Sequence, residues 1–332
     1  MRFGPVPPSE AEGAILAHSL TLAGRRLQKG RVLTAEDGAA LAAAGIASVT
    51  VARPDPDDVT EDVAAARLAA ALVPDPLAAA LRIGAAARGR VNLHAVGPGV
   101  VGLDAAAVKA INRVHSGITL ATLAPLVRVA PGMLVGTVKI LPYAVPGAAL
   151  ARACEAGRSA LRVHPVRRRS AGLILSEVVG QKPGLTAKGE AAVETRLKAL
   201  GISLGAVRVV PHEAGAMAAA LADLPGEIGL ILTGSATSDP RDVGPEAVRL
   251  AGGTVERFGM PVDPGNLLFL GAQGGRPVIG LPGCARSPAL NGADWVLERV
   301  ACGIEVDAAA IADMAVGGLL KEIPSRPQPR EA

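Results

Sequence analysis

Aromatic side chains are scarce in this chain of 332 residues, which has one Trp, one Tyr and three Phe. Half of the sequence is hydrophobic, so its cores must be built from closely packed aliphatic side chains. Cysteine is also rare: Cys154, Cys284 and Cys302 lie far apart, and no CxxC pair occurs. This odd and scattered set excludes a disulfide framework and a zinc site of the usual ligand spacing.

The chain also lacks a large excess of charge of one sign, since its formal net charge is only +4. Nucleic-acid-binding proteins usually show a basic stripe interleaved with aromatic residues. The dense basic run here has no aromatic neighbours and consists of Arg162, His164, Arg167, Arg168 and Arg169. The sequence therefore excludes nucleic acid as a main partner. The run is interpreted as a solvated linker between domains, with an anion-attracting rim as the alternative.

Long hydrophobic runs are missing too. No stretch of about 18 uncharged apolar residues occurs, which predicts that no segment spans a membrane. The first residues, MRFGPVPPSEAEG, lack the apolar segment of a signal peptide. We therefore expect a cytoplasmic protein without a membrane partner.

The length and the pattern of breaks predict several domains. We expect an α/β segment at 1–75, a mixed α/β domain at 76–160, a larger α/β domain at 165–305 and a tail at 306–332. Ser9 followed by Glu12 has capping-box spacing and predicts a helix, and Thr34 predicts the cap of a second helix that ends at Gly45. The proline-rich tail from Glu322 is predicted to be disordered.

The domain at 165–305 shows a β-α-β-α-β pattern. Buried strands are expected at 171–178, 204–210 and 229–233, with helices at 186–200 and 214–224 between them. This alternation predicts a parallel sheet with helices on both faces. Further on, we expect a helix at 244–251, strands at 254–262 and 278–281, and a helix at 287–302.

One loop of this domain carries the residues best suited to hold a ligand. Residues 232–246, LTGSATSDPRDVGPE, leave a buried strand and enter a helix. Ligands of open parallel sheets bind where the strands end, and small residues let backbone N–H groups approach a phosphate. The candidate binding residues are Thr233, Gly234, Ser235, Ala236, Thr237 and Ser238. Asp239 and Asp242 are candidates to hold a metal ion or to orient a reacting group. The alternative is a turn whose aspartates cap the next helix.

Two Pro-Gly turns could close around the same ligand, although ordinary turns are the alternative. They add Pro264 and Gly265, and then Pro282, Gly283 and Ser287, to the candidate binding residues. Cys284 follows the second turn, where a helix N-terminus would lower its pKa and favour a reactive thiolate or a metal ligand. The alternative for Cys284 is a small buried residue.

These segments resemble those of a known family. TGSATSDPRDVGPEA is similar to the TGGTGxxxRDxTPEA signature of molybdopterin-binding domains, which molybdopterin adenylyltransferases, molybdopterin molybdenumtransferases and gephyrin share. DPGNLLFLG and GRPVIGLPGCARSPAL resemble the molybdenumtransferase segments KPGKPxxxG and GKPVxGLPGNPVSA, in the same order across 171–303. The resemblance implies a parallel-sheet molybdopterin-binding domain preceded by smaller α/β domains. It also implies that Asp242 takes part in catalysis and that Mg²⁺ is a cofactor.

The sequence departs from the family at several of these positions. Ser235 and Ala236 replace a double glycine, Asp263 replaces a lysine, and Cys284 replaces an asparagine. Because catalysis tolerates fewer such changes than binding, we predict a molybdopterin-binding protein of molybdenum cofactor biosynthesis that holds the pterin phosphate at strand-end loops. An active molybdopterin molybdenumtransferase that inserts molybdate, and a non-catalytic carrier or sensor, remain the alternatives. Other cofactor-biosynthesis proteins are the implied partners, and a homodimer is an assembly that the resemblance leaves open.

Overall fold

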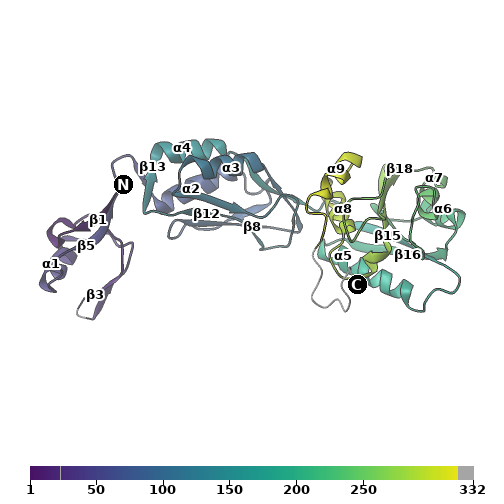
Figure 1. The fold of residues 1–332 in the computed structure, drawn as a ribbon, viewed down its shortest axis with the longest axis horizontal. Coiled ribbons are helices and arrows are strands. Elements are labelled where there is room, and N and C mark those ends of the chain that lie inside the picture. The colour runs from purple at the N-terminus through teal and green to yellow at the C-terminus, as the bar shows by residue number, and fades with distance from the viewer. Residues whose placement is uncertain (23, 321–332) are drawn as a thin grey trace. The chain divides into compact units, whose positions relative to one another are not determined.

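The computed structural model describes residues 1–22 and 24–320 (Figure 1). The chain divides into two compact units: unit 1 contains residues 1–96 and 101–163, and unit 2 contains residues 97–100 and the chain from His164 onward. Both units combine sheets with helices, so the predicted α/β class is confirmed. No helix among the described residues is long and apolar enough to cross a membrane. The predicted disorder from Glu322 onward lies outside the described residues.

Residues 1–53 of unit 1 form an antiparallel sheet of strand order β1-β5-β2, together with the hairpin β3-β4. The elements are β1 (Arg2–Val6), η1 (Pro8–Glu10), β2 (Ile15–Leu16), β3 (Leu20–Leu22), β4 (Arg25–Leu27), α1 (Ala35–Ala43) and β5 (Val49–Arg53). Thr34 caps α1, as predicted, and the structure adds a capping box with Asp37. The helix predicted after Ser9 is wrong. The chain forms only the short 3-10 turn η1 there, because Gly13 takes a left-handed φ of 72° and leads directly into β2.

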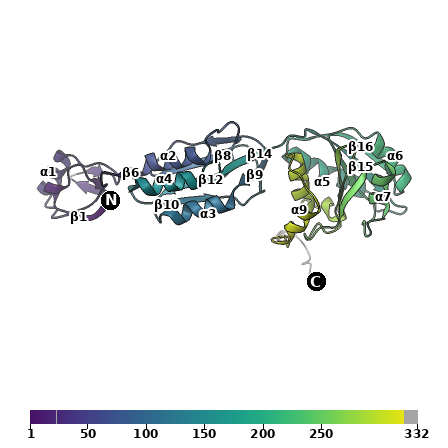
Figure 2. The same ribbon diagram turned by 90° about the horizontal axis from the view of Figure 1, so that it is seen from above.

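The rest of unit 1 is built around the antiparallel sheet β10-β12-β8-β7, with α2, α3 and α4 on one face (Figures 1 and 2). The elements between residues 58 and 165 are β6 (Asp58–Thr60), α2 (Glu61–Leu72), β7 (Leu81–Ile83), β8 (Arg90–Ala95), β9 (Gly99–Leu103), α3 (Ala105–Val114), β10 (Ile118–Thr122), β11 (Arg128–Val129), β12 (Leu134–Ile140), β13 (Ala144–Pro146), α4 (Gly147–Ala156) and β14 (Leu161–Pro165). Leu68 and Leu72 of α2 share one hydrophobic core with Val91 and Leu93 of β8. The domain boundary predicted after residue 75 stays a prediction. The helix α2 precedes this position and packs in the same hydrophobic core as the elements that follow it.

Unit 2 contains one sheet of strand order β16-β15-β17-β20-β19-β18. The strands are β15 (Ser170–Glu177), β16 (Ser203–Pro211), β17 (Ile228–Leu232), β18 (Thr254–Phe258), β19 (Phe269–Gln273) and β20 (Arg276–Leu281). The first four strands of that order are parallel, as predicted, whereas β19 and β18 run antiparallel to their neighbours. Every residue of β17 is buried, which is typical of a parallel strand covered on both faces.

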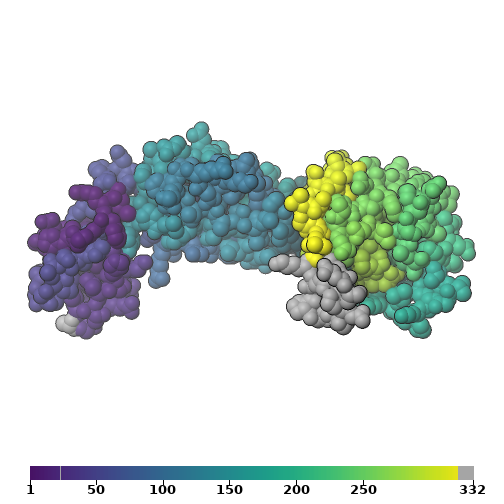
Figure 3. Space-filling model, viewed as in Figure 1, coloured from purple at the N-terminus to yellow at the C-terminus, as the bar shows by residue number. Residues whose placement is uncertain are grey.

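The helices of unit 2 cover both faces of this sheet, as predicted. They are α5 (Leu185–Ala199), α6 (Ala214–Ala222), α7 (Val243–Leu250), α8 (Gly292–Ala301) and α9 (Ala308–Ala312), with the 3-10 turns η2 (Gly283–Arg286) and η3 (Asp313–Ala315). Ile174 and Ile231 pack against α6 and α7, whereas Leu175 and Leu232 face Gly189 of α5. The helix α9 lies at the surface of unit 2 (Figure 3). The helix predicted to begin at Ser287 begins only at Gly292, because Asn291 and Asp294 form its capping box.

Candidate functional site

The predicted binding segments lie at one edge of the sheet in unit 2. Leu175, Leu232 and Leu281 are neighbours in the register of β15, β17 and β20, so the loops that follow these strands leave the sheet together. The turn between β18 and β19 lies at the same edge, because Phe269 pairs with Gly280 near the end of β20. This is the carboxyl edge of the parallel strands, where open α/β sheets bind their ligands.

The loop after β17 is held from the inside by hydroxyl groups. The buried Thr233 donates its Oγ1 hydroxyl to the carbonyl of Ser235 at 2.6 Å and lies 3.4 Å from Oγ1 of the buried Thr237. Ser235, Ala236 and Ser238 are exposed. The loop is therefore fixed by two threonines and presents its small residues to solvent.

Gly234 lies where the loops after β15 and β17 approach each other. Its N–H donates to Oγ of Ser176 at 3.0 Å. A Cβ on Gly234 would lie 2.6 Å from the carbonyl oxygen of Ser176 and 2.8 Å from Oε1 of Gln181. Only glycine therefore fits at this position without moving the loop after β15.

Both predicted catalytic carboxylates are bound within their own loop. Asp242 is the N-cap of α7: its Oδ1 accepts from the N–H of Val243 at 2.7 Å and its Oδ2 accepts from the N–H of Ser238 at 3.0 Å. Asp239 accepts from the N–H and from Nε of Arg241, and these bonds hold the pKa of Asp239 below its usual value. Asp242 therefore caps the helix α7, which is the alternative role that the sequence offered for the aspartates of this loop.

A metal ion at Asp239 and Asp242 stays a prediction. Among the described residues, no group of three or more His, Cys, Asp or Glu side chains is placed to hold one. The hydrogen bonds of both carboxylates give them a structural role in the loop whether or not Mg²⁺ binds there.

The loop after β20 is fixed by the buried Arg196 of α5. Its Nε pairs with Oδ1 of Asp294 at 2.5 Å, and its other nitrogens donate to the carbonyls of Ala285 and Ser287, both at 2.8 Å. Pro282 precedes η2, and Gly283 is its first residue. The predicted residues Pro282, Gly283 and Ser287 therefore belong to a loop that α5 and α8 hold in place.

Arg286 links the loop after β20 to the loop after β17. Its Nη2 donates to the carbonyl of Thr233 at 2.7 Å. Its Nε is buried and has no hydrogen-bond partner among the described residues, and burial lowers the pKa of the guanidinium. Oε1 of Gln181, next to Gly234, is also buried and has no hydrogen-bond partner among the described residues. The edge thus carries a cationic donor and an acceptor whose hydrogen-bonding capacity is unused.

Ser176 and His212 connect the ends of the first three parallel strands. Oγ of Ser176 lies 2.9 Å from Nδ1 of His212 and accepts from Gly234, while the N–H of His212 donates to the carbonyl of Glu177. Neither residue was among the predicted binding residues, nor were Gln181 and Arg286. The signal in the sequence is their position: Ser176 lies near the end of β15, and the other three follow strands of the sheet by one to five residues.

The turn with Pro264 and Gly265 packs against the start of α8. The carbonyl of Pro264 accepts from the N–H of Gly292 at 2.8 Å. Gly265 has φ of 145°, and a Cβ there would lie 2.8 Å from the nitrogen of Gly292. This turn is bonded to α8, whereas Arg286 is bonded to Thr233 of the loop after β17. The part that Pro264 and Gly265 play in ligand binding stays a prediction.

Cys284 is a free, exposed thiol in η2. The interpretation of Cys284 as a small buried residue is therefore wrong. Nδ2 of Asn291 donates to its Sγ at 3.1 Å.

Residues 5–53 match the model of a domain of unknown function (DUF8806). No curated protein matches the chain. A molybdopterin biosynthesis MoeA protein from Pyrococcus horikoshii is 14% identical over 92% of this chain and 76% of its own, with a TM-score of 0.33.

Two further solved structures are similar to parts of the chain. The molybdopterin biosynthesis enzyme MoaB from Thermus thermophilus is 21% identical over 40% of this chain and 89% of its own, with a TM-score of 0.27. A molybdenum cofactor biosynthesis protein from Pyrococcus furiosus is 12% identical over 92% of this chain and 66% of its own, with a TM-score of 0.25. Similarity this low does not identify what the present chain binds.

Proposed function

We propose that this chain binds the pterin phosphate of molybdopterin at the carboxyl edge of the unit 2 sheet and takes part in molybdenum cofactor biosynthesis. The observation that carries the proposal is the guanidinium of Arg286, a half-buried cation that bonds to the loop after β17. Its Nε faces Gly189 of α5, so a phosphate bound at this edge would contact the terminal nitrogens of the guanidinium and compensate its charge.

The surroundings of Arg286 suit such an anion. The exposed residues Ser235, Ala236 and Ser238 lie in the loop to which Arg286 is bonded. Arg286 also supplies positive charge to a domain in which Asp263 replaces a lysine of the family that it resembles. Molybdopterin is preferred over other phosphate compounds because residues 233–247 and 275–290 resemble the molybdopterin-binding signatures.

We favour a binding protein, acting as a carrier or sensor, over an active molybdopterin molybdenumtransferase. Asp242 is the residue that the resemblance links to catalysis, and both of its carboxylate oxygens already accept backbone hydrogen bonds. A carboxylate used in this way stabilises the loop and the start of α7. It is therefore less available to hold a metal ion or to move a proton.

Calorimetric titration with purified molybdopterin tests the proposal. We expect Arg286→Gln to weaken binding by about tenfold or more, because a hydrogen bond to a charged group contributes about 1.5–3 kcal/mol. Lys198→Gln removes the same charge from the exposed end of α5 and should bind like the wild type. Wild-type affinity in Arg286→Gln would contradict the anion site, and no binding to the wild type would contradict molybdopterin as the ligand.

The same preparation separates a carrier from an enzyme. Conversion of bound molybdopterin in the presence of molybdate and Mg²⁺ would identify a molybdenumtransferase. Asp242→Asn is the matched variant, because asparagine also caps helices but carries no charge. Binding without conversion in the wild type would support a carrier or sensor.

A further inference from the structure

A second candidate site lies in residues 1–53 of unit 1, apart from the carboxyl edge of unit 2. A pocket of about 400 Å³ lies between the hairpin β3-β4 and the helix α1. This volume is within the range of small-molecule sites, about 300–1,000 Å³. The pocket therefore has room for a ligand of that class.

One wall of the pocket is a single face of the hairpin. Leu22 pairs with Arg25 across the two strands, and Leu20 pairs with Leu27. Because side chains alternate along a strand, these four share one face, whereas the side chain of Arg26 is on the other. Leu27 is buried, but Leu22 is only half-buried and the side chain of Arg25 is 67% exposed. The hairpin thus places an accessible apolar side chain next to a solvated cation.

The opposite wall is an alanine face of α1. Ala40, Ala43 and Ala44 line the pocket, and all three are exposed. Their spacing of three and four positions brings them to the same side of the helix. Larger side chains at these positions would fill the space beside Leu22. The three methyl groups and Leu22 therefore form an apolar surface that is open to a ligand.

The charged groups at the pocket leave one positive charge over. The buried carboxylate of Asp37 accepts from Nε of Arg31 at 2.7 Å, from its Nη2 at 3.2 Å and from the N–H of Thr34 at 3.1 Å. Nη2 of Arg25 lies 3.9 Å from Oδ1 of Asp37, which is beyond hydrogen-bond distance. The single carboxylate is thus paired with Arg31, and Arg25 is the cation that remains for a ligand.

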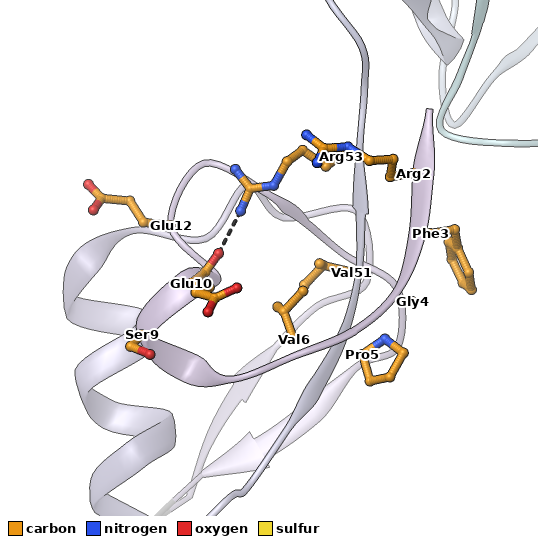
Figure 4. A pocket seen from close by; sticks show the side chains of 10 residues that line it. All are labelled: Arg2, Phe3, Gly4, Pro5, Val6, Ser9, Glu10, Glu12, Val51 and Arg53. Atoms are coloured by element: carbon orange, nitrogen blue, oxygen red, sulfur yellow. Dashed lines mark hydrogen bonds between the residues drawn. The ribbon is translucent and has the colours of Figure 1, made fainter.

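The larger groove beside β1, of about 620 Å³, has its side chains engaged in a different way (Figure 4). Arg53 donates to the carbonyl of Glu10 at 2.5 Å, and Val51 is only 2% exposed. Arg53 is therefore already bonded within the protein and Val51 offers no open surface, so neither residue is available to a ligand.

We propose that the pocket between the hairpin and α1 binds a small carboxylate with an apolar chain. The carboxylate contacts the guanidinium of Arg25, and the chain lies between Leu22 and the alanine face of α1. One net positive charge matches a monoanion, and a carboxylate pairs with the fork of a guanidinium through two hydrogen bonds. A cation of the same length would be repelled by Arg25, and a shorter carboxylate would bury less apolar surface. The proposal is independent of molybdopterin binding in unit 2.

Octanoate, octylammonium and butyrate test the two parts of this pattern. Each is titrated into the full chain labelled with ¹⁵N, and amide resonances are followed. We expect octanoate to shift the resonances of residues 25–27 and 37–44 in a saturable manner. Octylammonium should bind about tenfold more weakly, because it loses the bond to Arg25. Butyrate should bind about a hundredfold more weakly, because it has fewer CH₂ groups to bury.

Two results of these titrations would contradict the proposal. Equal affinity for octanoate and octylammonium would overturn the role of Arg25. The absence of any saturable shift with octanoate would overturn the binding of an apolar carboxylate as a whole.

Two alanine variants locate the apolar part of the site. Ala43→Leu fills the pocket, whereas Ala42→Leu makes the same change at an exposed position of α1 that does not line it. Leucine is favoured in helices almost as much as alanine, so both chains should stay folded, which circular dichroism checks. We expect Ala43→Leu to weaken octanoate binding about tenfold and Ala42→Leu to leave it unchanged. Equal octanoate binding by the two folded variants would overturn the proposed position of the site.

Two arginine variants locate the charged part. Arg25→Gln removes the cation that lines the pocket, and Arg26→Gln removes the same charge from the opposite face of the hairpin. We expect Arg25→Gln to weaken octanoate binding about tenfold without weakening that of octylammonium, and Arg26→Gln to bind both like the wild type. Equal losses of octanoate affinity in the two variants would show that only the general charge of the hairpin acts, and would overturn the contact with Arg25.

Discussion

The guanidinium of Arg196 joins three segments that border the candidate molybdopterin site. It extends from α5 to Asp294 of α8 and to two carbonyls of the loop after β20. We expect Arg196→Met to lower the free energy of unfolding of unit 2 by about 3–5 kcal/mol, because Asp294 would remain buried without its partner. Urea denaturation followed by the fluorescence of Trp295 measures this change.

Two further variants separate the charge of Arg196 from its geometry. Arg196→Lys keeps the charge but cannot make the forked hydrogen bonds, so it should fall between Arg196→Met and the wild type. Arg196→Met combined with Asp294→Asn should recover part of the loss, since the unpaired charge is removed. A loss below about 1 kcal/mol in Arg196→Met would show that the loop is held by other contacts.

The three cysteines differ in their surroundings and should differ in reactivity. Burial raises the pKa of Cys302 to about 11 and also raises that of Cys154, whereas Cys284 is exposed. Since the thiolate is the reactive form, a disulfide reagent near neutral pH should modify Cys284 rapidly and Cys302 only on unfolding. Peptide mass spectrometry over time measures this order. Cys284→Ser should remove the fast phase, and rapid modification of Cys302 in the folded chain would contradict the prediction.

At the scale of single elements, the start of α1 depends on one hydroxyl group. Thr34 accepts from the N–H of Asp37 at 3.2 Å, and the carboxylate of Asp37 accepts from the N–H of Thr34 at 3.1 Å. We expect Thr34→Ala to lower the free energy of unfolding of unit 1 by about 1 kcal/mol and Thr34→Ser to change it little. Denaturation followed by circular dichroism measures both, and equal losses in the two variants would contradict the capping role.

The same capping box should respond to acid. The hydrogen bond from Arg31 is the main reason why the pKa of Asp37 lies below its usual value. Because the pKa is lowered in the folded state, the stabilisation is present above about pH 4 and is lost as the pH falls through the folded pKa. Asp37→Asn should therefore flatten the dependence of stability on pH below about pH 4. An unchanged slope in that variant would contradict the assignment.

The elements that the sequence predicted are those with local signals. Apolar runs and the caps between them were enough to predict β15, α5, β17 and α6, because burial and capping act over a few neighbouring residues. The helix after Ser9 failed for the opposite reason. Its capping-box spacing was present, but Gly13 turns the chain so that Ile15 and Leu16 pair with β5 instead.

For the candidate site, too, the sequence predicted only part of what the structure has. Parallel strands bring their carboxyl ends to one edge, so loops far apart in sequence could be placed together. The side chains that join those loops could not be predicted. Arg286 and Thr233 are 53 positions apart, and Arg196 and Asp294 are 98 positions apart. Such pairs depend on the packing of whole helices, to which no local pattern in one sequence corresponds.

At the scale of the whole molecule, the two units have separate hydrophobic cores. Leu93 of β8 belongs to a core formed within unit 1, whereas the buried Leu230 lies in β17, whose Ile231 packs against α6 and α7 within unit 2. A unit with its own core can unfold as a cooperative transition of its own. The single Trp, Trp295, lies in α8, so its fluorescence reports on unit 2 alone, whereas circular dichroism reports on both units.

We therefore expect core variants to affect one transition each. Leu230→Ala and Leu93→Ala both remove a fully buried side chain, which costs about 2–5 kcal/mol. In urea denaturation, Leu230→Ala should move the fluorescence transition to lower urea, whereas Leu93→Ala should leave it in place and move only a part of the circular dichroism signal. If both variants shifted a single transition seen by both signals, the units would unfold together. The binding change expected for Arg286 in unit 2 would then have to be measured against the stability of the entire chain.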